Sequence, residues 1–250
     1  MRSVLTSVIG IAVLVALWET AARLGILATA LPAPSRIAGI LAEKWNVYLF
    51  HLVPTLQAAA LGLGLAIACS LALTLLIIAF PRTRVEIFSF IVVISSIPLI
   101  ALTPLFIAFL GSGISTRAII AALSSFLPIA SAVTQGAGRV DPNLNELFRI
   151  LNAGRLNYFA HCGWQMTLPF ILAGLKTAGP IAVLATVIAE WAGADRGLGL
   201  LIVQSMFAFN VPQTWGAICL CCGLAYGVYL LIAVLETAVL RRYHPAMASS

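Results

Sequence analysis

The sequence predicts an all-α integral membrane protein with about six transmembrane helices. Three observations indicate this class: 62% of the 250 residues are hydrophobic, only 9% are charged, and the mean hydropathy is +1.07. Soluble domains carry about 25% charged residues, and a chain of this length in water still needs a polar surface. Most of the surface must therefore face lipid.

Six apolar stretches are long enough to cross a bilayer, which takes about 20 residues. They cover approximately residues 4–24, 53–80, 87–110, 118–136, 168–192 and 215–240. Proline and glycine motifs typical of loops separate several of them, namely "PAPSR" from Pro32, "PRTR" from Pro81, "GSG" from Gly111 and "GADRGLG" from Gly193. Because no internal repeat or low-complexity tract divides the chain, we expect a single transmembrane domain covering residues 1–250.

The first stretch has an alternative interpretation. Arg2, the apolar run to Trp18 and the small residues "ATA" from Ala28 resemble a secretory signal peptide with its cleavage site. The apolar run continues to about Leu24, which is long enough to span the membrane, and this favours an uncleaved first helix.

The basic residues favour an orientation with both termini in the cytoplasm. On that topology eight arginines lie inside, which are Arg2, Arg82, Arg84, Arg139, Arg149, Arg155, Arg241 and Arg242. Five basic residues lie outside, which are Arg23, Arg36, Lys44, Arg117 and Arg196. The net charge of +6 follows this bias of the loops. Since no run of Lys or Arg forms a patch, we expect no nucleic-acid partner.

The stretch between the fourth and fifth spans is unusually polar. Asp141 followed by Pro142 is typical of a helix start, and four apolar residues then share one face, Leu144, Leu147, Phe148 and Leu151. Asn152 and Gly154 predict a break, and a second amphipathic helix follows. Such a helix pair either lies on the lipid surface or docks into a groove of a cytoplasmic partner, and the residues alone leave both open.

The same stretch matches a family signature of Glu-Ala-Ala, three residues, Gly, and a fixed gap to Leu-Pro. Glu146 falls on the Glu, Asn152 on the Gly, and Leu168-Pro169 on the Leu-Pro, without a gap. Five further segments are similar to the same family, namely "LWETAARLGIL", "LPAPSRI", "IPLIALTPLFIAFLGSG", "FLPIASAVTQGAGRVDPNLNEL" and "AEWAGADRGLGLLI". Over nearly its whole length the chain resembles the permease subunit of binding-protein-dependent bacterial ABC importers of the nitrate/sulfonate/taurine/bicarbonate type.

Two departures from that signature affect the coupling loop. Leu147 and Phe148 replace the two Ala, which changes the fit of the loop in a groove. Asn152 replaces the Gly, and Asn is the next-best residue for a left-handed turn.

The resemblance implies a type I ABC importer permease fold, multi-pass in the cell (inner) membrane, with a cytoplasmic coupling-helix loop at about residues 140–168. It implies three partners besides lipid: an ABC ATPase subunit, a substrate-binding protein and a second permease copy, as a homodimer or a pair with a related permease. The residues expected to meet the ATPase are Glu146, Leu147, Phe148, Arg149, Asn152, Ala153, Gly154 and Arg155. The chain has no P-loop pattern, so ATP hydrolysis is expected on a separate chain, and this one is not an enzyme.

Residues of the third and fifth spans are candidates for the translocation path. They are Ser95, Ser96, Pro98, Thr103 and Glu190. Ser and Thr also join membrane helices, and Glu190 also fits a solvated interfacial acid, so both interpretations stay open. The "CLCC" run from Cys219 lies in an apolar span with no His or acid nearby, and the three histidines are too scattered for a metal site. We therefore expect no cofactor or metal.

Two other functions remain as alternatives to the importer. A diverged, non-transporting membrane scaffold is motivated by the altered loop. A secondary transporter driven by an ion gradient is disfavoured because the sequence places no carboxylate at mid-membrane. Small anions and precursors related to the thiamin pyrimidine or riboflavin are substrates that the family resemblance allows.

Overall fold

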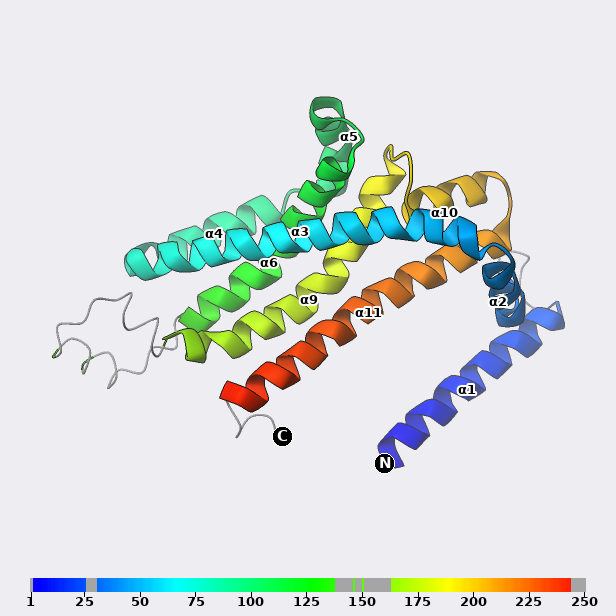
Figure 1. Cartoon of the computed structure of the whole chain (residues 1–250), viewed down its shortest axis with the longest axis horizontal. Helices are drawn as coiled ribbons and strands as arrows, with labels where there is room; N and C mark the ends of the chain where they lie inside the picture. Colours follow the sequence, from blue (N-terminus) through cyan, green and yellow to red (C-terminus); the bar gives the residue numbers. More distant parts are fainter. Residues whose placement is uncertain (1, 26–30, 138–145, 147–149, 151–162, 244–250) are drawn as a thin grey trace.

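The computed structural model describes residues 2–25, 31–137, 146, 150 and 163–243, and within these ranges it contains helices and no strand (Figure 1). The elements are α1 (Arg2–Arg23), α2 (Pro34–Glu43), α3 (Trp45–Ala79), a 3-10 turn η1 (Pro81–Thr83), α4 (Arg84–Ser95), α5 (Leu99–Leu110), α6 (Ile114–Ala137), α9 (Trp164–Trp191), α10 (Leu198–Phe207) and α11 (Val211–Tyr243). The predicted all-α class is confirmed.

Four of these helices are long and apolar enough to cross a membrane. The qualifying segments are Trp45–Ile77, Ile114–Gly136, Trp164–Trp191 and Val211–Arg241. They match the second, fourth, fifth and sixth predicted spans, and α1 lies where the first was predicted. Large apolar side chains such as Leu65 on α3 and Val234 on α11 are exposed, as expected for helices whose solvent is lipid.

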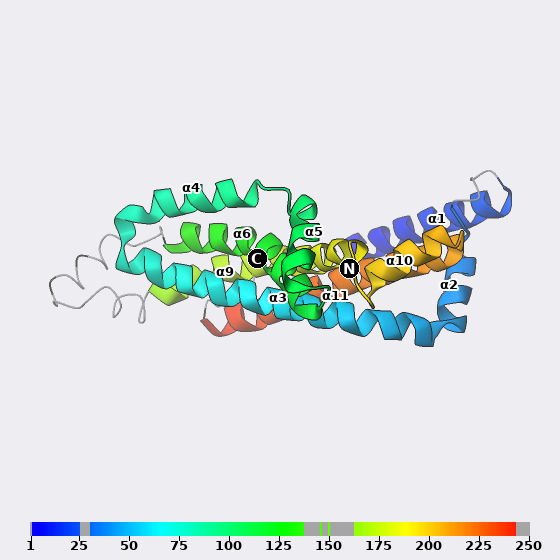
Figure 2. The same ribbon diagram turned by 90° about the horizontal axis from the view of Figure 1, so that it is seen from above.

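The third predicted span, at residues 87–110, is divided into two helices instead of one. α4 ends at Ser95, where the hydroxyl of Ser96 donates to the carbonyl of Val92 at 2.8 Å, and α5 begins at Leu99. Pro98 has no amide hydrogen and disfavours helical backbone in the residue before it, which explains the break. Seen from above, α4 runs back in the direction opposite to α3 and packs against α6, and α5 then turns away (Figure 2).

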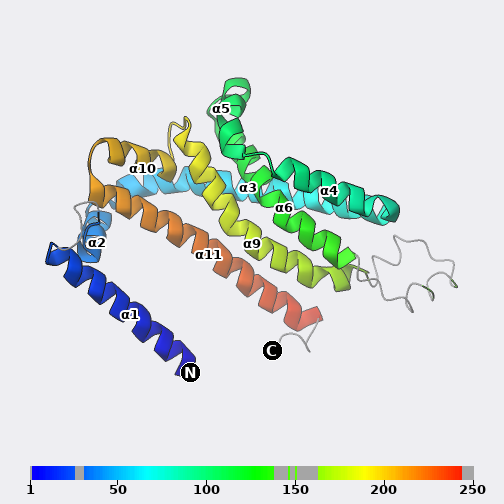
Figure 3. The same cartoon turned by 180° about the vertical axis from the view of Figure 1, so that it is seen from behind.

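The centre of the molecule is a bundle in which α9 packs between α6 and α11, with α3 against α6 and α9 (Figure 3). Glycines allow α6 and α9 to approach closely. A Cβ atom on Gly174 would meet Ala132 and the carbonyl of Pro128, and one on Gly136 would meet Thr167. Contacts between small residues are typical of tightly packed membrane helices.

The bundle has two ends that matter for function. At the proximal end, α6 ends at Ala137 and α9 begins at Trp164, so residues 138–163 connect there. At the distal end, α9 finishes and α10 packs against the first turns of α3 and α11 (Figure 1). Tyr48 is wholly buried in this distal core with Leu198 and Ala217, and its hydroxyl donates to the carbonyl of Gln213 at 3.2 Å.

Candidate functional site

Most of the predicted coupling loop lies outside the described residues. These are Leu147, Phe148, Arg149, Asn152, Ala153, Gly154 and Arg155. Glu146 is described and is exposed. Because residues 138–163 join the ends of α6 and α9, any force on them acts directly on the two helices that pack through Gly136 and Gly174.

The predicted pathway residues on the third span differ in burial and in their surroundings. A cavity of about 700 Å³ opens between α3, α4, α5 and α6, and of these residues Ser95 lines it. Its other walls are leucine, isoleucine and phenylalanine side chains, with Glu86 as a second polar residue. Ser96 and Pro98 are exposed at the turn, whereas the Thr103 hydroxyl is buried and donates to its own helix.

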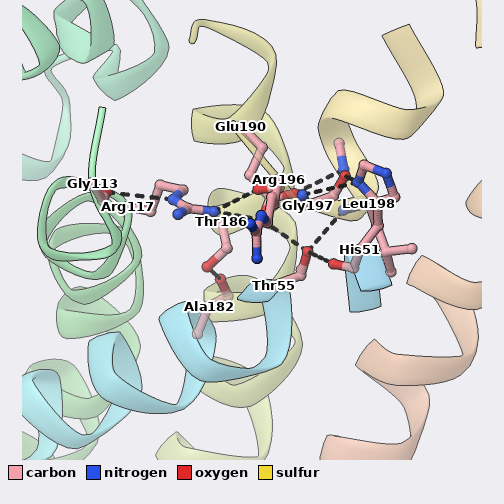
Figure 4. Close-up of polar contacts among 11 residues, drawn as sticks. His51, Thr55, Gly113, Arg117, Ala182, Thr186, Glu190, Arg196, Gly197 and Leu198 are labelled. Carbon is pink, nitrogen blue, oxygen red and sulfur yellow. Dashed lines mark hydrogen bonds and ion pairs between the residues drawn. The ribbon is translucent and has the colours of Figure 1, made fainter. Parts of the chain in front are cut away.

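Glu190, the remaining predicted pathway residue, belongs to a different group of polar side chains at the distal end. We call this group the distal polar cluster. It comprises His51 and Thr55 of α3, Arg117 of α6 and Glu190 of α9, around the backbone at the start of α10 (Figure 4). The cluster therefore joins α3, α6 and α9, which are far apart in the sequence, to the start of α10.

The Glu190 carboxylate is 0% exposed and has hydrogen-bond partners at both oxygens. Oε1 accepts from the Thr55 hydroxyl at 2.8 Å and lies 3.5 Å from Nη1 of Arg117. Oε2 accepts from the backbone N–H of Gly199 at 2.8 Å, in the first turn of α10. The N-terminal end of a helix carries partial positive charge, so α10 and Arg117 together stabilise the buried carboxylate.

The other cluster residues bind the backbone that leads into α10. Arg117 donates to the carbonyl of Arg196 at 2.8 Å, and the Thr55 hydroxyl accepts from the N–H of Leu198 at 2.9 Å. Nδ1 of His51 lies 2.9 Å from the carbonyl oxygen and 3.2 Å from the nitrogen of Gly197, and its tautomer decides whether it donates or accepts. With Glu190 of α9, which binds Gly199, three helices thus hold one short stretch of backbone.

Two glycines make this approach possible. Gly197 has φ of +144°, and a Cβ atom there would fall on the Glu190 carboxylate. A Cβ atom on Gly199 would collide with the carbonyl oxygen of Val187. Only glycine combines the positive φ with the absent side chain that the carboxylate contact needs.

Sequence reasoning found Glu190 but missed His51, Thr55 and Arg117. One signal was present, because the predicted topology put the charges of Arg117 and Glu190 on the same side of the membrane. The sequence did not indicate His51 and Thr55, because a polar residue within an apolar helix is compatible with many functions. Among the described residues no group of three or more His, Cys, Asp or Glu lies close enough to hold a metal ion.

The chain matches a protein-family model over residues 60–245, described as the binding-protein-dependent transport system inner membrane component. That match covers most of the chain, from within α3 to beyond α11. The chain belongs to this family. It is an ABC importer permease and a multi-pass membrane protein.

Three curated relatives span most of the chain. It is 32% identical to the riboflavin transport system permease protein RibX of Chloroflexus aurantiacus, over 91% of this chain and 86% of the relative. It is 29% identical to the formylaminopyrimidine transport permease protein ThiX of Halalkalibacterium halodurans, over 82% of each. It is 30% identical to the putative aliphatic sulfonates transport permease protein SsuC of Bacillus subtilis, over 78% of this chain and 71% of the relative.

Proposed function

We propose that the chain is the transmembrane subunit of an ATP-driven importer, in which a soluble binding protein delivers a small solute. The observation that carries the proposal is the family match over residues 60–245, which includes the whole stretch from α6 through residues 138–163 to α9. The family description names dependence on a binding protein. ATP hydrolysis takes place on a separate ABC ATPase subunit, and two permease copies form the pathway.

The coupling step follows from how α6 and α9 are connected. The coupling loop, at about residues 140–168, binds in a groove of the ATPase, and Glu146, Asn152 and their neighbours make the contacts. When the ATPase subunits close on ATP, they pull on both helices at once. Since these helices pack through Gly136 and Gly174 against backbone and short side chains, they move as one body rather than sliding. A rigid-body rotation of this pair alternates access between the two membrane faces.

The translocation path runs beside the break between α4 and α5. Ser95, one of the predicted pathway residues, lines the cavity between these helices and α3 and α6. Its volume, near 700 Å³, is in the range of small-molecule sites. The names of the relatives mention formylaminopyrimidine, riboflavin and aliphatic sulfonates. We propose that the solute of this chain is likewise a small organic molecule.

The test is a reconstituted complex of this chain, its ATPase and its binding protein, with uptake and ATP hydrolysis measured together. Glu146→Ala, or a short deletion around Asn152, should abolish uptake while the ATPase alone stays active. Glu43→Ala is the matched control, because Glu43 is also an exposed acid and lies on α2.

Each alternative function has its own outcome in this experiment. A diverged scaffold gives no stimulation of ATP hydrolysis by the loaded binding protein. A secondary transporter gives uptake by this chain alone in liposomes with an ion gradient. ATP-driven uptake that persists after the deletion around Asn152 contradicts the proposed coupling.

A further inference from the structure

One exposed segment rests on the distal polar cluster, namely residues 191–196, which we call the distal loop. Trp191 is 51% exposed, and Asp195 and Arg196 are also exposed. The Arg196 guanidinium lies over the ring of Phe50, 4.5 Å from its centroid. The distal loop thus carries an exposed Trp and two exposed opposite charges within six residues.

The backbone of this loop is fixed by hydrogen bonds, although its side chains are exposed. The N–H of Ala194 donates to the carbonyl of Glu190 at 3.3 Å, and Arg117 binds the carbonyl of Arg196. Directly after the loop, His51 binds Gly197. Surface loops usually have few such constraints, so this one is held in a single shape.

Stability alone does not explain this arrangement. Burying a carboxylate is costly, and apolar residues of similar volume often stabilise a protein as well as a buried ion pair does. The bonds from Glu190, Thr55 and Arg117 converge on the loop and on the first residues of α10. What the cluster provides is one defined conformation of that backbone.

We infer that the distal loop is the docking surface for the soluble binding protein, and that Glu190 is the positioning residue that holds the loop in its docking shape. This inference rests on the proposed function. A loop that is already ordered loses little conformational entropy when a protein partner binds. A half-exposed Trp on a fixed backbone is typical of the residues that dominate protein interfaces.

The surroundings of the loop favour a protein over a lipid surface as the partner. Asp195 and Arg196 are consecutive exposed residues, and a carboxylate next to anionic headgroups is unfavourable. Adjacent opposite charges suit a folded partner with complementary charges, which fixes the orientation of docking. The loop also lies at the distal end, opposite the proposed site of the ATPase.

The experiment uses the whole complex in nanodiscs, with ATP hydrolysis measured against binding-protein concentration. Arg196→Glu and Asp195→Lys should each raise the half-saturating concentration at least tenfold, because they reverse a charge at the interface. If either charge reversal reduces expression, Arg196→Gln replaces it, because this variant removes the positive charge without introducing a negative one. Arg82→Glu, a charge reversal at an exposed proximal residue, is the matched control and should leave the half-saturating concentration unchanged.

The positioning role of Glu190 has a separate readout. Glu190→Gln should raise the half-saturating concentration of the binding protein severalfold and leave the rate of ATP hydrolysis at saturation unchanged. The reason is that the backbone of the loop is no longer fixed, whereas all its side chains are still present. Thr55→Ser, which retains the hydroxyl, should behave as the unmodified chain. A role in stability alone would lower the yield of folded complex without moving the half-saturating concentration.

Each failure has a distinct meaning. If the unmodified complex is not stimulated at any binding-protein concentration, the proposed function itself is wrong. If stimulation is normal but the loop variants leave the half-saturating concentration unchanged, the docking surface lies elsewhere. If the loop variants act and Glu190→Gln does not, Glu190 is not the positioning residue. If the effects vanish in nanodiscs without anionic lipid, the loop binds headgroups, and the inference is overturned.

Discussion

Thr55 and Glu190 are 135 residues apart in the sequence, yet the Thr55 hydroxyl donates to the Glu190 carboxylate at 2.8 Å in a wholly buried site. The same hydroxyl oxygen accepts from the N–H of Leu198. One side chain on α3 therefore connects the end of α9 to the start of α10. This contact links α3, α9 and α10 into one distal unit.

Thr55→Val tests the energetic weight of that contact. Valine has nearly the same shape as threonine but leaves the N–H of Leu198 without a partner and removes one donor from Glu190. Leaving a buried polar group unsatisfied costs about 1–3 kcal/mol. We expect a clear fall in the thermal midpoint of the detergent-solubilised chain, whereas Thr55→Ser should stay close to the original. An unchanged midpoint for Thr55→Val would show that water or another group replaces the hydroxyl.

Gly197→Ala should be among the most damaging single substitutions in the chain. Alanine at φ of +144° is strained, and its Cβ would fall on the Glu190 carboxylate. Backbone strain of this kind costs about 1–3 kcal/mol before the collision is counted. The measurement is the yield of monodisperse protein after extraction from the membrane.

Gly193→Ala is the control that separates strain from collision. Gly193 has φ of +150°, but a Cβ atom there would lie 3.6 Å from Ile107, an ordinary contact. It should therefore lose less folded protein than Gly197→Ala. Equal losses at the two positions would assign the whole effect to backbone strain and none to the carboxylate.

The long helices were predictable from the sequence because a bilayer demands about 20 apolar residues in a row. That rule located α3, α6, α9 and α11, but it misread residues 87–110 as one helix. Residues 87–110 are long and apolar enough to satisfy the rule. The break at Ser96–Pro98 was missed because membrane helices often tolerate a proline, so Pro98 alone did not indicate it. The short α10 also escaped it, since ten residues do not span a bilayer.

The distal polar cluster shows a second limit of sequence reasoning. Its contacts pair His51 with Gly197 and Arg117 with Glu190, across 146 and 73 residues respectively. Sequence periodicity predicts individual helices, but it does not predict which residues of different helices contact one another. Glu190 was singled out as an unusual acid at a span end, but its partners became visible only when α3, α6 and α10 were placed around it.

Gly174→Leu tests whether α6 and α9 act as one body. Even a Cβ atom on Gly174 would meet Ala132 and the carbonyl of Pro128, so a leucine side chain would force the two helices apart. Overpacking of this kind costs about 1–3 kcal/mol. We expect ATP hydrolysis in the complex to lose its stimulation by the binding protein, because a loosened pair no longer transmits movement.

The control for Gly174→Leu is Gly227→Leu on α11. A Cβ atom on Gly227 has no neighbour within 4 Å, so the same substitution meets open space in the isolated chain. Stimulation should be retained in that variant. If Gly227→Leu is the more harmful of the two, that face of α11 is covered in the assembled permease, and the dimer contact should be sought there.

Lys176 of α9 and Glu236 of α11 form an ion pair between two membrane-spanning helices. The Lys176 side chain is 29% exposed and the Glu236 side chain 16%, so both charges are partly withdrawn from solvent. Lys176→Met leaves the partly buried Glu236 without this partner and should lower the thermal midpoint. In Lys176→Met/Glu236→Leu no charge remains, and most of the loss should be recovered. The coupling in this double-mutant cycle should be about 1–2 kcal/mol, as for polar contacts between membrane helices. A double variant that simply adds the two single losses would mean that the two charges stabilise the chain independently.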